Sequence, residues 1–352
     1  MSQINPDLRV EQFDYDVPHE LIAQTPLKDR EASRLLVIER GSANLTHHRV
    51  RDLAWLLRAG DLVVVNNTRV MAGRLHGARE SGGRVELLLL RRNERGWLAL
   101  AKPAKRLRDG ETVRILPADR AEGHGGSATV LAHLEDGLVQ VELSVGMEAE
   151  LEHIGVLPLP PYIHERLEDP QRYQTVYGTA LGSAAAPTAG LHLTRELFAR
   201  LQDAGMGIGY ATLHVGLDTF RPVTVERVSD HVIHREWCEV SLELAGQIEA
   251  TRRAGGRVVA IGTTTARTLE TFGSKLEEER AGGWSGWTDI FITPGYRWTT
   301  VDALLSNFHL PRSTLLMMVS SFAGSDQIRA AYATAMAERY RLFSFGDAML
   351  IL

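Results

Sequence analysis

Between about residues 69 and 143 the chain alternates apolar and polar positions over short runs, the pattern of half-buried β-strands. Turn sequences such as Asp109-Gly110 and Asp136-Gly137 separate these runs. Six short strands at this spacing predict a small β-barrel. The expected strands span residues 73–78, 84–90, 97–101, 112–116, 127–134 and 138–143, and the glycine-rich residues 121–127 are expected to form a mobile hairpin loop.

The flanking parts of the chain alternate helix-like runs with short, continuously apolar ones. Thr194 and Ser241 are suitable helix caps, and Gly205 and Gly255 stand where two of these helices should end. Such alternation predicts an α/β domain with a largely parallel sheet. Helices are expected at residues 51–57, 194–203, 242–253, 264–272, 314–321 and 326–341, and strands at 61–65, 209–215, 258–261, 289–292 and 348–352.

The two patterns predict two domains, which suits a chain of 352 residues. Residues 1–66 and 146–352 should build one discontinuous α/β domain. Residues 67–145 should form the inserted β-barrel domain.

Composition favours a soluble enzyme of the cytoplasm. The sequence has no apolar run of the roughly 18 residues that a membrane span needs, and its first ten residues do not resemble a signal peptide. The single cysteine, Cys238, excludes an intrachain disulfide and is expected to be a small buried apolar residue.

Charge is unevenly distributed along the chain. Residues 91–120 hold nine basic and four acidic side chains, although the whole chain has a net charge of −5. A basic segment of this kind suits contact with a polyanion. The alternative is that lysine and arginine protect exposed strand edges of the barrel.

Residues 182–194 form the first of four loops that are rich in ligand-binding groups. Small residues such as Gly190 let the backbone approach a ligand closely, and Thr188 and His192 add a hydroxyl and a titratable ring. The helix that starts after Thr194 offers amides to an anionic group. The alternative is a tight packing loop whose histidine is satisfied within the protein.

Two further loops carry histidines. The first brings His214 to the end of an expected strand before Gly216 and Thr219, which is where α/β enzymes place catalytic groups. The second holds Asp230, His231, His234 and Glu236, of which His234 and Glu236 would share one face of an extended segment. We expect hydrogen-bonding and acid/base roles there, since neither a cysteine pair nor HExxH supports a zinc site. The alternatives are a structural histidine in the first loop and a solvated polar turn in the second.

The fourth loop joins the expected strand 258–261 to a helix through Gly262 and three threonines. Amides and hydroxyls of Thr263, Thr264 and Thr265 could form an anion site, to which Arg267 could add a bidentate contact. The alternative is an ordinary capped helix start. The loop lacks the GK[ST] element and the spacing of GxGxxG, which disfavours ATP hydrolysis and dinucleotide redox chemistry.

Long runs of the sequence, in order, resemble the S-adenosylmethionine:tRNA ribosyltransferase-isomerases of queuosine biosynthesis. The resemblance covers nearly the whole chain. It is carried by Phe13-Asp14-Tyr15, Leu21-Ile22-Ala23-Gln24, Ser33-Arg34-Leu35, Asn67-Thr68-Arg69-Val70, Leu157-Pro158-Leu159-Pro160-Pro161-Tyr162-Ile163, Arg172-Tyr173-Gln174-Thr175-Val176-Tyr177, Ala185-Ala186-Pro187-Thr188-Ala189-Gly190-Leu191-His192, Thr212-Leu213-His214-Val215-Gly216, Gly262-Thr263-Thr264, Asn307-Phe308-His309-Leu310-Pro311 and Phe345-Gly346-Asp347-Ala348-Met349-Leu350-Ile351.

This resemblance implies a fold and a reaction. The fold is a mixed-sheet, loosely barrel-like α/β domain with an inserted small six-stranded β-barrel. In the reaction, the ribosyl moiety of S-adenosylmethionine is transferred and isomerised onto 7-aminomethyl-7-deazaguanine at the wobble position of tRNA with a GUN anticodon. Adenine and methionine leave and epoxyqueuosine-tRNA forms. We expect a monomer with no metal and no permanently bound cofactor, and S-adenosylmethionine as the ribosyl donor.

The reaction needs several acid/base groups, because the attacking amine is mostly protonated at neutral pH and adenine needs a proton or a hydrogen bond to leave. We expect Asp230 and Glu236 to offset the cationic sulfonium and amine, and His192 or His214 to shuttle protons. Tyr162, Tyr173 or Tyr296 could stack a splayed anticodon base. The expected catalytic residues are His192, His214, Asp230, His231, His234 and Glu236; the expected substrate-binding residues are Arg172, Tyr173, Thr188, Gly190, Gly216, Thr219, Thr263, Thr264, Arg267, Asn307 and His309; the expected tRNA contacts are Lys102, Lys105, Arg106 and Arg108.

The chain departs from the family pattern at three places: Asn67 where aspartate is common, Leu193 where phenylalanine is usual, and Leu217-Asp218 where a second glycine is usual. The first change removes a carboxylate and the second a stacking ring. Three alternative functions remain at this point. They are an S-adenosylmethionine-dependent tRNA methyltransferase, a relative acting on a different nucleoside, and a non-catalytic RNA-binding protein.

Overall fold

The computed structural model describes residues 4–117, 125–216 and 222–352. The chain divides into two compact units. The first contains residues 1–68, 160–180 and 186–352, and the second contains residues 69–159 and 181–185. The second unit is therefore longer at its carboxyl end than the insert of residues 67–145 expected from sequence, and it includes a short return segment.

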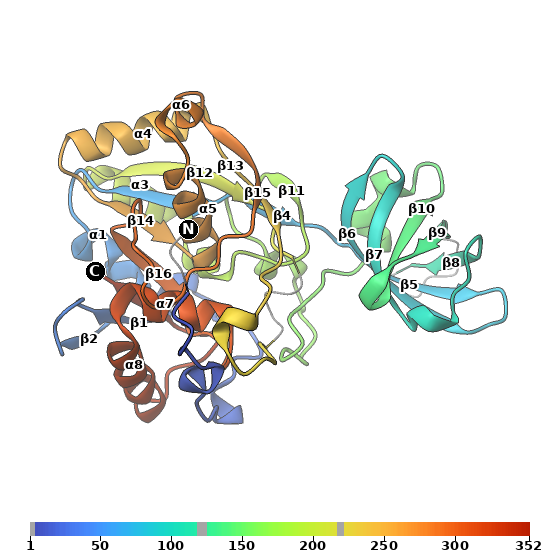
Figure 1. The fold of residues 1–352 in the computed structure, drawn as a ribbon, viewed down its shortest axis with the longest axis horizontal. Helices are drawn as coiled ribbons and strands as arrows, with labels where there is room; N and C mark the ends of the chain where they lie inside the picture. Colours follow the sequence, from blue (N-terminus) through green and yellow to red (C-terminus); the bar gives the residue numbers. More distant parts are fainter. Residues whose placement is uncertain (1–3, 118–124, 217–221) are drawn as a thin grey trace. The chain divides into compact units, whose positions relative to one another are not determined.

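The first unit is built on a mixed sheet of nine strands (Figure 1). Strand β1 pairs in parallel with β17, so the two ends of the chain meet within one sheet. The pairs β12·β3, β3·β14 and β14·β16 are also parallel, and the other four are antiparallel. The order is β15 (Trp284–Thr288), β13 (Glu236–Val240), β12 (Gly207–Leu213), β3 (Leu62–Asn66), β14 (Val258–Ile261), β16 (Ala303–Asn307), β17 (Ala348–Ile351), β1 (Arg34–Ile38) and β2 (Leu45–Arg49).

Alternate residues of the central strands point into two separate cores. Leu62 and Val64 of β3 belong to one core, and Val63 and Val65 belong to the other. Both faces are covered, which is why β3 is apolar along most of its length. Helices α4 (Leu242–Arg253), α5 (Thr263–Gly273), α7 (Thr314–Ala323) and α8 (Ser325–Ala337) contribute to the first core, and α1 (Leu53–Leu56) and α3 (Arg195–Asp203) to the second. The short α6 spans Glu277–Arg280.

The second unit contains a closed antiparallel barrel of six strands, which confirms the barrel predicted from sequence. Inward-facing residues such as Leu75, Leu87 and Val113 fill its core, and their neighbours along the strands face outward. The strand order is β10 (Leu138–Leu143), β7 (Gly96–Lys102), β6 (Arg84–Asn93), β5 (Arg74–Arg79), β8 (Thr112–Leu116) and β9 (Ser127–His133). Helix α2 (Leu151–Ile154) follows in sequence, and β4 (Thr68–Val70) pairs with β11 (Ala180–Ser183) in a ladder of two strands.

The prediction of a strand at residues 289–292 is wrong. The strand β15 ends earlier, at Thr288, and the backbone of Ile290 pairs with side chains instead. Its carbonyl accepts from Arg267, and its N–H donates to the hydroxyl of Thr288. Six further strands, β1, β2, β4, β11, β13 and β16, were not anticipated, and residues 121–124 of the expected hairpin loop lie outside the described residues.

Candidate active site

A cavity of about 620 Å³, including the part open to solvent, lies in the first unit. The strands β12, β14 and β16 run in one direction, and Val215, Gly262 and Asn307 stand at or just beyond their carboxyl ends. Ligands of open α/β sheets bind at this edge. The lining residues are Tyr162, Ala186, Pro187, Thr188, Ala189, Val215, Gly262, Thr263, Thr264, Ser306, Asn307, Phe308, His309, Leu310, Ser313, Leu315, Phe343 and Ser344.

A second cavity of about 370 Å³ shares Thr263, Thr264 and Leu315 with the first, so the two flank the start of α5. His234, Glu236 and Arg267 are among its lining residues. The first cavity has no Asp, Glu, Lys or Arg among its described lining residues, and the second has a carboxylate and a guanidinium.

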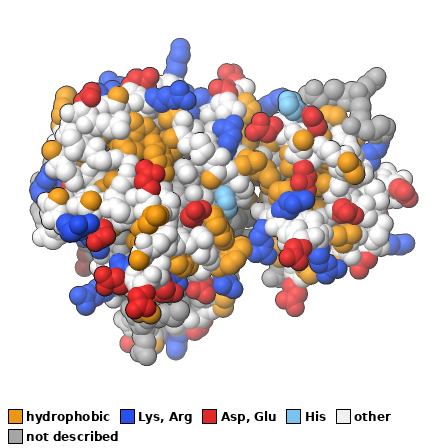
Figure 2. All heavy atoms as spheres, turned by 90° about the horizontal axis from the view of Figure 1, so that it is seen from above, with side chains coloured by type: hydrophobic (Ala, Val, Ile, Leu, Met, Phe, Trp, Pro, Cys, Tyr) orange, Lys and Arg blue, Asp and Glu red, His pale blue; other side chains and the backbone are white. Residues whose placement is uncertain are grey.

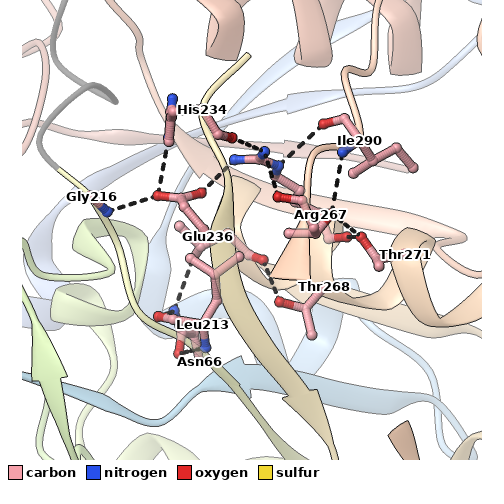
Figure 3. Close-up of polar contacts among 11 residues, drawn as sticks. Asn66, Leu213, Gly216, His234, Glu236, Arg267, Thr268, Thr271 and Ile290 are labelled. Carbon is pink, nitrogen blue, oxygen red and sulfur yellow. Dashed lines mark hydrogen bonds and ion pairs between the residues drawn. The ribbon is translucent and has the colours of Figure 1, made fainter. Parts of the chain in front are cut away.

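Glu236 is a buried carboxylate, with 4% of its surface exposed, at the start of β13. The N–H of Gly216 donates to Oε1 over 2.8 Å, the His234 Nε2 lies 3.2 Å from the same oxygen, and Arg267 binds Oε2 (Figure 3). Burial alone raises the pKa of a carboxyl group. The contacts from His234, Arg267 and Gly216 outweigh this and hold the pKa of Glu236 below its usual value, so the carboxylate is ionised.

The Arg267 guanidinium forms its hydrogen bonds within the protein. Besides Glu236, its guanidinium donates to the carbonyl of Ile290 over 3.2 Å and to the carbonyl of His234 over 2.9 Å (Figure 3). The expected contact of Arg267 with an anionic ligand is therefore replaced by a positioning role, since these bonds fix the Glu236 carboxylate. The hydroxyl of Thr264 accepts from Asn66, and Thr263 and Thr264, two of the predicted substrate-binding residues, line both cavities.

The other acidic and histidine residues of this region are less central. Asp230 is exposed and accepts from Ser229, so it does not lie with Glu236 in the described cavities. The His231 ring packs against Phe291. His214 stacks on Trp237, and its Nδ1 lies 3.0 Å from the Thr68 hydroxyl, which itself donates to the Ala180 carbonyl. Nδ1 therefore carries the proton, and burial lowers the pKa of His214.

His192 lies behind the first cavity and is not among its described lining residues. Its Nε2 accepts a hydrogen bond of 3.1 Å from Asn307 Nδ2, which requires an unprotonated Nε2. Burial, followed by the nearby Arg30 and Arg341, lowers the pKa of His192 to about 4. A neutral, buried ring held in this way is better suited to positioning the Asn307 amide than to the proton transfer expected from sequence.

His309 lines the first cavity, and its Nε2 lies 2.7 Å from the Ser306 hydroxyl. Burial lowers the pKa of His309 to about 3, so the ring is neutral.

Three predicted substrate-binding residues have structural partners instead. Tyr173 is fully buried and packs edge-on against Phe345, so it cannot stack a splayed base. Arg172 donates to the Leu27 carbonyl. Gly190 permits a close approach, since a Cβ there would lie 2.0 Å from the Tyr177 hydroxyl.

The remaining predicted contacts have clear positions. Thr188 and Tyr162 line the first cavity, whereas the Tyr296 hydroxyl donates to Glu270. Thr219, Leu217 and Asp218 lie outside the described residues. Of the departures from the family pattern, Asn67 accepts from the Thr212 hydroxyl, and Leu193 is buried in the second core.

Lys102, Lys105, Arg106 and Arg108 are exposed on the barrel unit, at the end of β7 and in the turn before β8. Within the described part of the chain none of the four forms an ion pair within 4 Å. Basic and acidic side chains are interspersed on the face shown in Figure 2. No described helix has the length and apolarity to cross a membrane, and no described group of three His, Cys, Asp or Glu side chains has the arrangement of a metal site.

Sequence reasoning missed several lining residues, among them Ser306, Leu315, Phe343 and Ser344. Ser306 lies in β16 and Leu315 in α7, on either side of the run from Asn307 to Pro311, and Phe343 and Ser344 come from a separate loop before β17. No local pattern marks these residues as ligand contacts.

Comparison with known proteins identifies relatives over nearly the whole chain. Residues 10–351 match the model of a family described as queuosine biosynthesis protein. An S-adenosylmethionine:tRNA ribosyltransferase-isomerase of Symbiobacterium thermophilum is 53% identical over 349 residues, covering 98% of this chain and 100% of the relative. A crystal structure of an S-adenosylmethionine tRNA ribosyltransferase from Thermotoga maritima matches with a TM-score of 0.56 and 36% identity, covering 97% of this chain and 100% of that one.

Proposed function

Since the chain belongs to the queuosine biosynthesis protein family, we propose that it is an S-adenosylmethionine:tRNA ribosyltransferase-isomerase. It transfers the ribosyl moiety of S-adenosylmethionine to the aminomethyl group of 7-aminomethyl-7-deazaguanine in tRNA and isomerises it. Epoxyqueuosine-tRNA, adenine and methionine are the products. The observation that carries the proposal is the match of family and relatives over almost the full length.

The site supports this chemistry through Glu236. The sulfonium of S-adenosylmethionine and the aminomethyl group of the acceptor are both cations, and Glu236 is a buried, ionised carboxylate that lines a cavity. A carboxylate with few competing waters stabilises a nearby cation more strongly than one at the surface does. Arg267 fixes this carboxylate and offsets part of its charge, which keeps it ionised without a ligand.

Proton transfers need a group that can change its protonation state. His234 has a half-buried ring whose Nε2 faces Glu236, so His234 and Glu236 together form the acid/base pair of the proposed site. His214 remains a second proposed proton carrier, since its Nδ1–H donates to Thr68 and its Nε2 can accept. His192 acts through Asn307.

The tRNA is held by Lys102, Lys105, Arg106 and Arg108, whose exposed charges suit phosphate contacts. We further propose that the acceptor has a GUN anticodon, that the enzyme acts as a monomer in the cytoplasm, and that it holds no permanent cofactor.

The decisive experiment incubates the full chain with S-adenosylmethionine and tRNA that bears the aminomethyl-deazaguanine. We expect release of free adenine and a gain in tRNA mass equal to the epoxycyclopentandiol group. Formation of S-adenosylhomocysteine with a methylated tRNA would instead identify a methyltransferase. Unmodified tRNA with guanine at the wobble position is the matched control and should release no adenine.

A further inference from the structure

The first cavity offers shape and hydrogen bonds but no charge. Its described lining combines apolar side chains, such as Pro187, Val215 and Phe343, with hydroxyls, one amide and the neutral His309. A zwitterionic amino acid or a phosphate bound there would lose water without gaining a charged partner. The cavity therefore favours a neutral group with hydrogen-bonding edges, and a nucleobase is such a group.

One side-chain oxygen of the lining residues has no hydrogen-bond partner in the described protein. Asn307 is 2% exposed, and its Oδ1 has no hydrogen-bond partner among the described residues. Its Nδ2 donates to His192 Nε2 and to the Phe343 carbonyl, each over 3.1 Å. A carbonyl oxygen cannot donate, so the amide cannot be flipped, and Oδ1 must be the atom that is left over.

A buried acceptor without a hydrogen-bond partner is energetically unfavourable, and a donor from a ligand relieves this. The matching ligand group is an N–H, and adenine presents one at its exocyclic amine. The neutral His192 ring is what orients the amide, because its Nε2 lone pair accepts one of the two Nδ2 protons.

We propose that the first cavity binds the adenine base of S-adenosylmethionine, with the exocyclic amine donating to Asn307 Oδ1 and with His192 as the positioning residue of that amide. The inference rests on the proposed function, and it assigns the donor's base to the uncharged cavity. The sulfonium end then belongs on the Glu236 side of Thr263 and Thr264, which line both cavities.

The 7-deazaguanine of the tRNA is the other base with an N–H edge in this reaction. Its aminomethyl group is a cation before it reacts, and the described lining of the first cavity has no carboxylate to receive it. Glu236 lines the second cavity. The charge difference between the cavities thus favours adenine in the first.

The test measures binding of neutral nucleosides to the full chain by calorimetry. The probes are 5′-methylthioadenosine, its inosine analogue, in which a carbonyl replaces the amine, and its purine analogue, in which hydrogen does. We expect methylthioadenosine to bind at least about tenfold more tightly than either analogue, since one buried hydrogen bond decides the difference. Equal affinities for the three probes would overturn the proposal, and this comparison needs no variant.

Substitutions at Asn307 and His192 then test which residues cause the preference for methylthioadenosine. Asn307→Ala should bring the three affinities to within about twofold of one another, because the acceptor is gone. His192→Gln offers an acceptor to Asn307 and should keep the preference, whereas His192→Leu should lose it. A purely structural role of His192 would lower all three affinities together, and that result would contradict its positioning role.

Two outcomes separate this inference from the proposed function. Amine-dependent binding without adenine release on tRNA would refute the proposed reaction and leave the adenine site standing. If free 7-aminomethyl-7-deazaguanine binds in an Asn307-dependent manner while the three nucleosides do not differ, the cavity serves the acceptor base and the inference is overturned.

Discussion

The Arg267 guanidinium on helix α5 binds the Glu236 carboxylate at the start of β13, and both side chains are almost fully buried. The two residues are 31 positions apart in sequence. Their pairing makes the carboxylate available, ionised and fixed in direction, beside a cavity at the carboxyl edge of the sheet.

Glu236→Gln should weaken both folding and activity. The variant leaves the Arg267 charge buried without its counter-ion, which costs about 3–5 kcal/mol of stability. Adding Arg267→Met removes that unpaired charge and should restore much of the free energy of unfolding, measured by urea denaturation. Adenine release should remain low in both variants, and its recovery in the double variant would show that Glu236 is only structural. Asp326→Asn, at an exposed ion pair, is the control and should change stability by less than about 1 kcal/mol.

Stability should depend on the titration of His192 in weak acid. Its pKa is lowered from 6.5 to about 4, so the unfolded chain takes up this proton before the folded protein does. The stabilising contribution is complete above pH 6.5 and is lost as the pH falls toward 4, by about 3 kcal/mol in all. Urea unfolding at several pH values should show a smaller loss in His192→Gln than in the wild type. His153→Gln, at an exposed side chain, should behave like the wild type.

Neutralising Lys102, Lys105, Arg106 and Arg108 should weaken tRNA binding and its dependence on salt. Each lost phosphate contact lowers the slope of log K against log salt by about 0.7–0.9, so the four together should lower it by about 3. Filter binding at several salt concentrations measures this slope. The control replaces the same number of exposed arginines on the α/β unit, Arg195, Arg253, Arg329 and Arg339, with glutamine. An unchanged slope in the first variant would remove these residues from the tRNA surface.

Gly190→Ala should destabilise the protein by about 1–3 kcal/mol, because the new Cβ would lie 2.0 Å from the Tyr177 hydroxyl. Tyr177→Phe in the same chain removes that atom and should recover part of the loss. Gly246→Ala is the matched control, since the middle of α4 is open there and alanine should stabilise the helix by about 0.5–1 kcal/mol. Thermal unfolding of the wild type, Gly190→Ala, the double variant with Tyr177→Phe, and Gly246→Ala measures these three changes in stability. Equal effects at Gly190 and Gly246 would exclude the steric explanation.

The sequence alone determined the barrel and most helices. The barrel strands were recognisable because each alternates inward and outward residues, and the α4 prediction matched in full because Ser241 caps the helix and Gly255 follows its end. These patterns involve residues close together in sequence, so they can be recognised without knowledge of the fold. The β13 strand was missed for the opposite reason, since it starts within a polar run, at a buried glutamate whose main partner, Arg267, is distant in sequence.

The candidate site likewise has features that the sequence predicts and features that only the tertiary structure determines. The sequence singled out the loop of residues 182–194, the threonines after Gly262, and Glu236. The loop contributes to the first cavity, Glu236 to the second, and Thr263 and Thr264 to both. Only the tertiary structure decided what these residues do. In the fold, His192 lies outside the described lining and accepts a hydrogen bond from Asn307, and Arg267 pairs with Glu236. Whether a polar side chain is exposed, paired or aimed at a ligand depends on neighbours that are distant in sequence, and local patterns do not specify those neighbours.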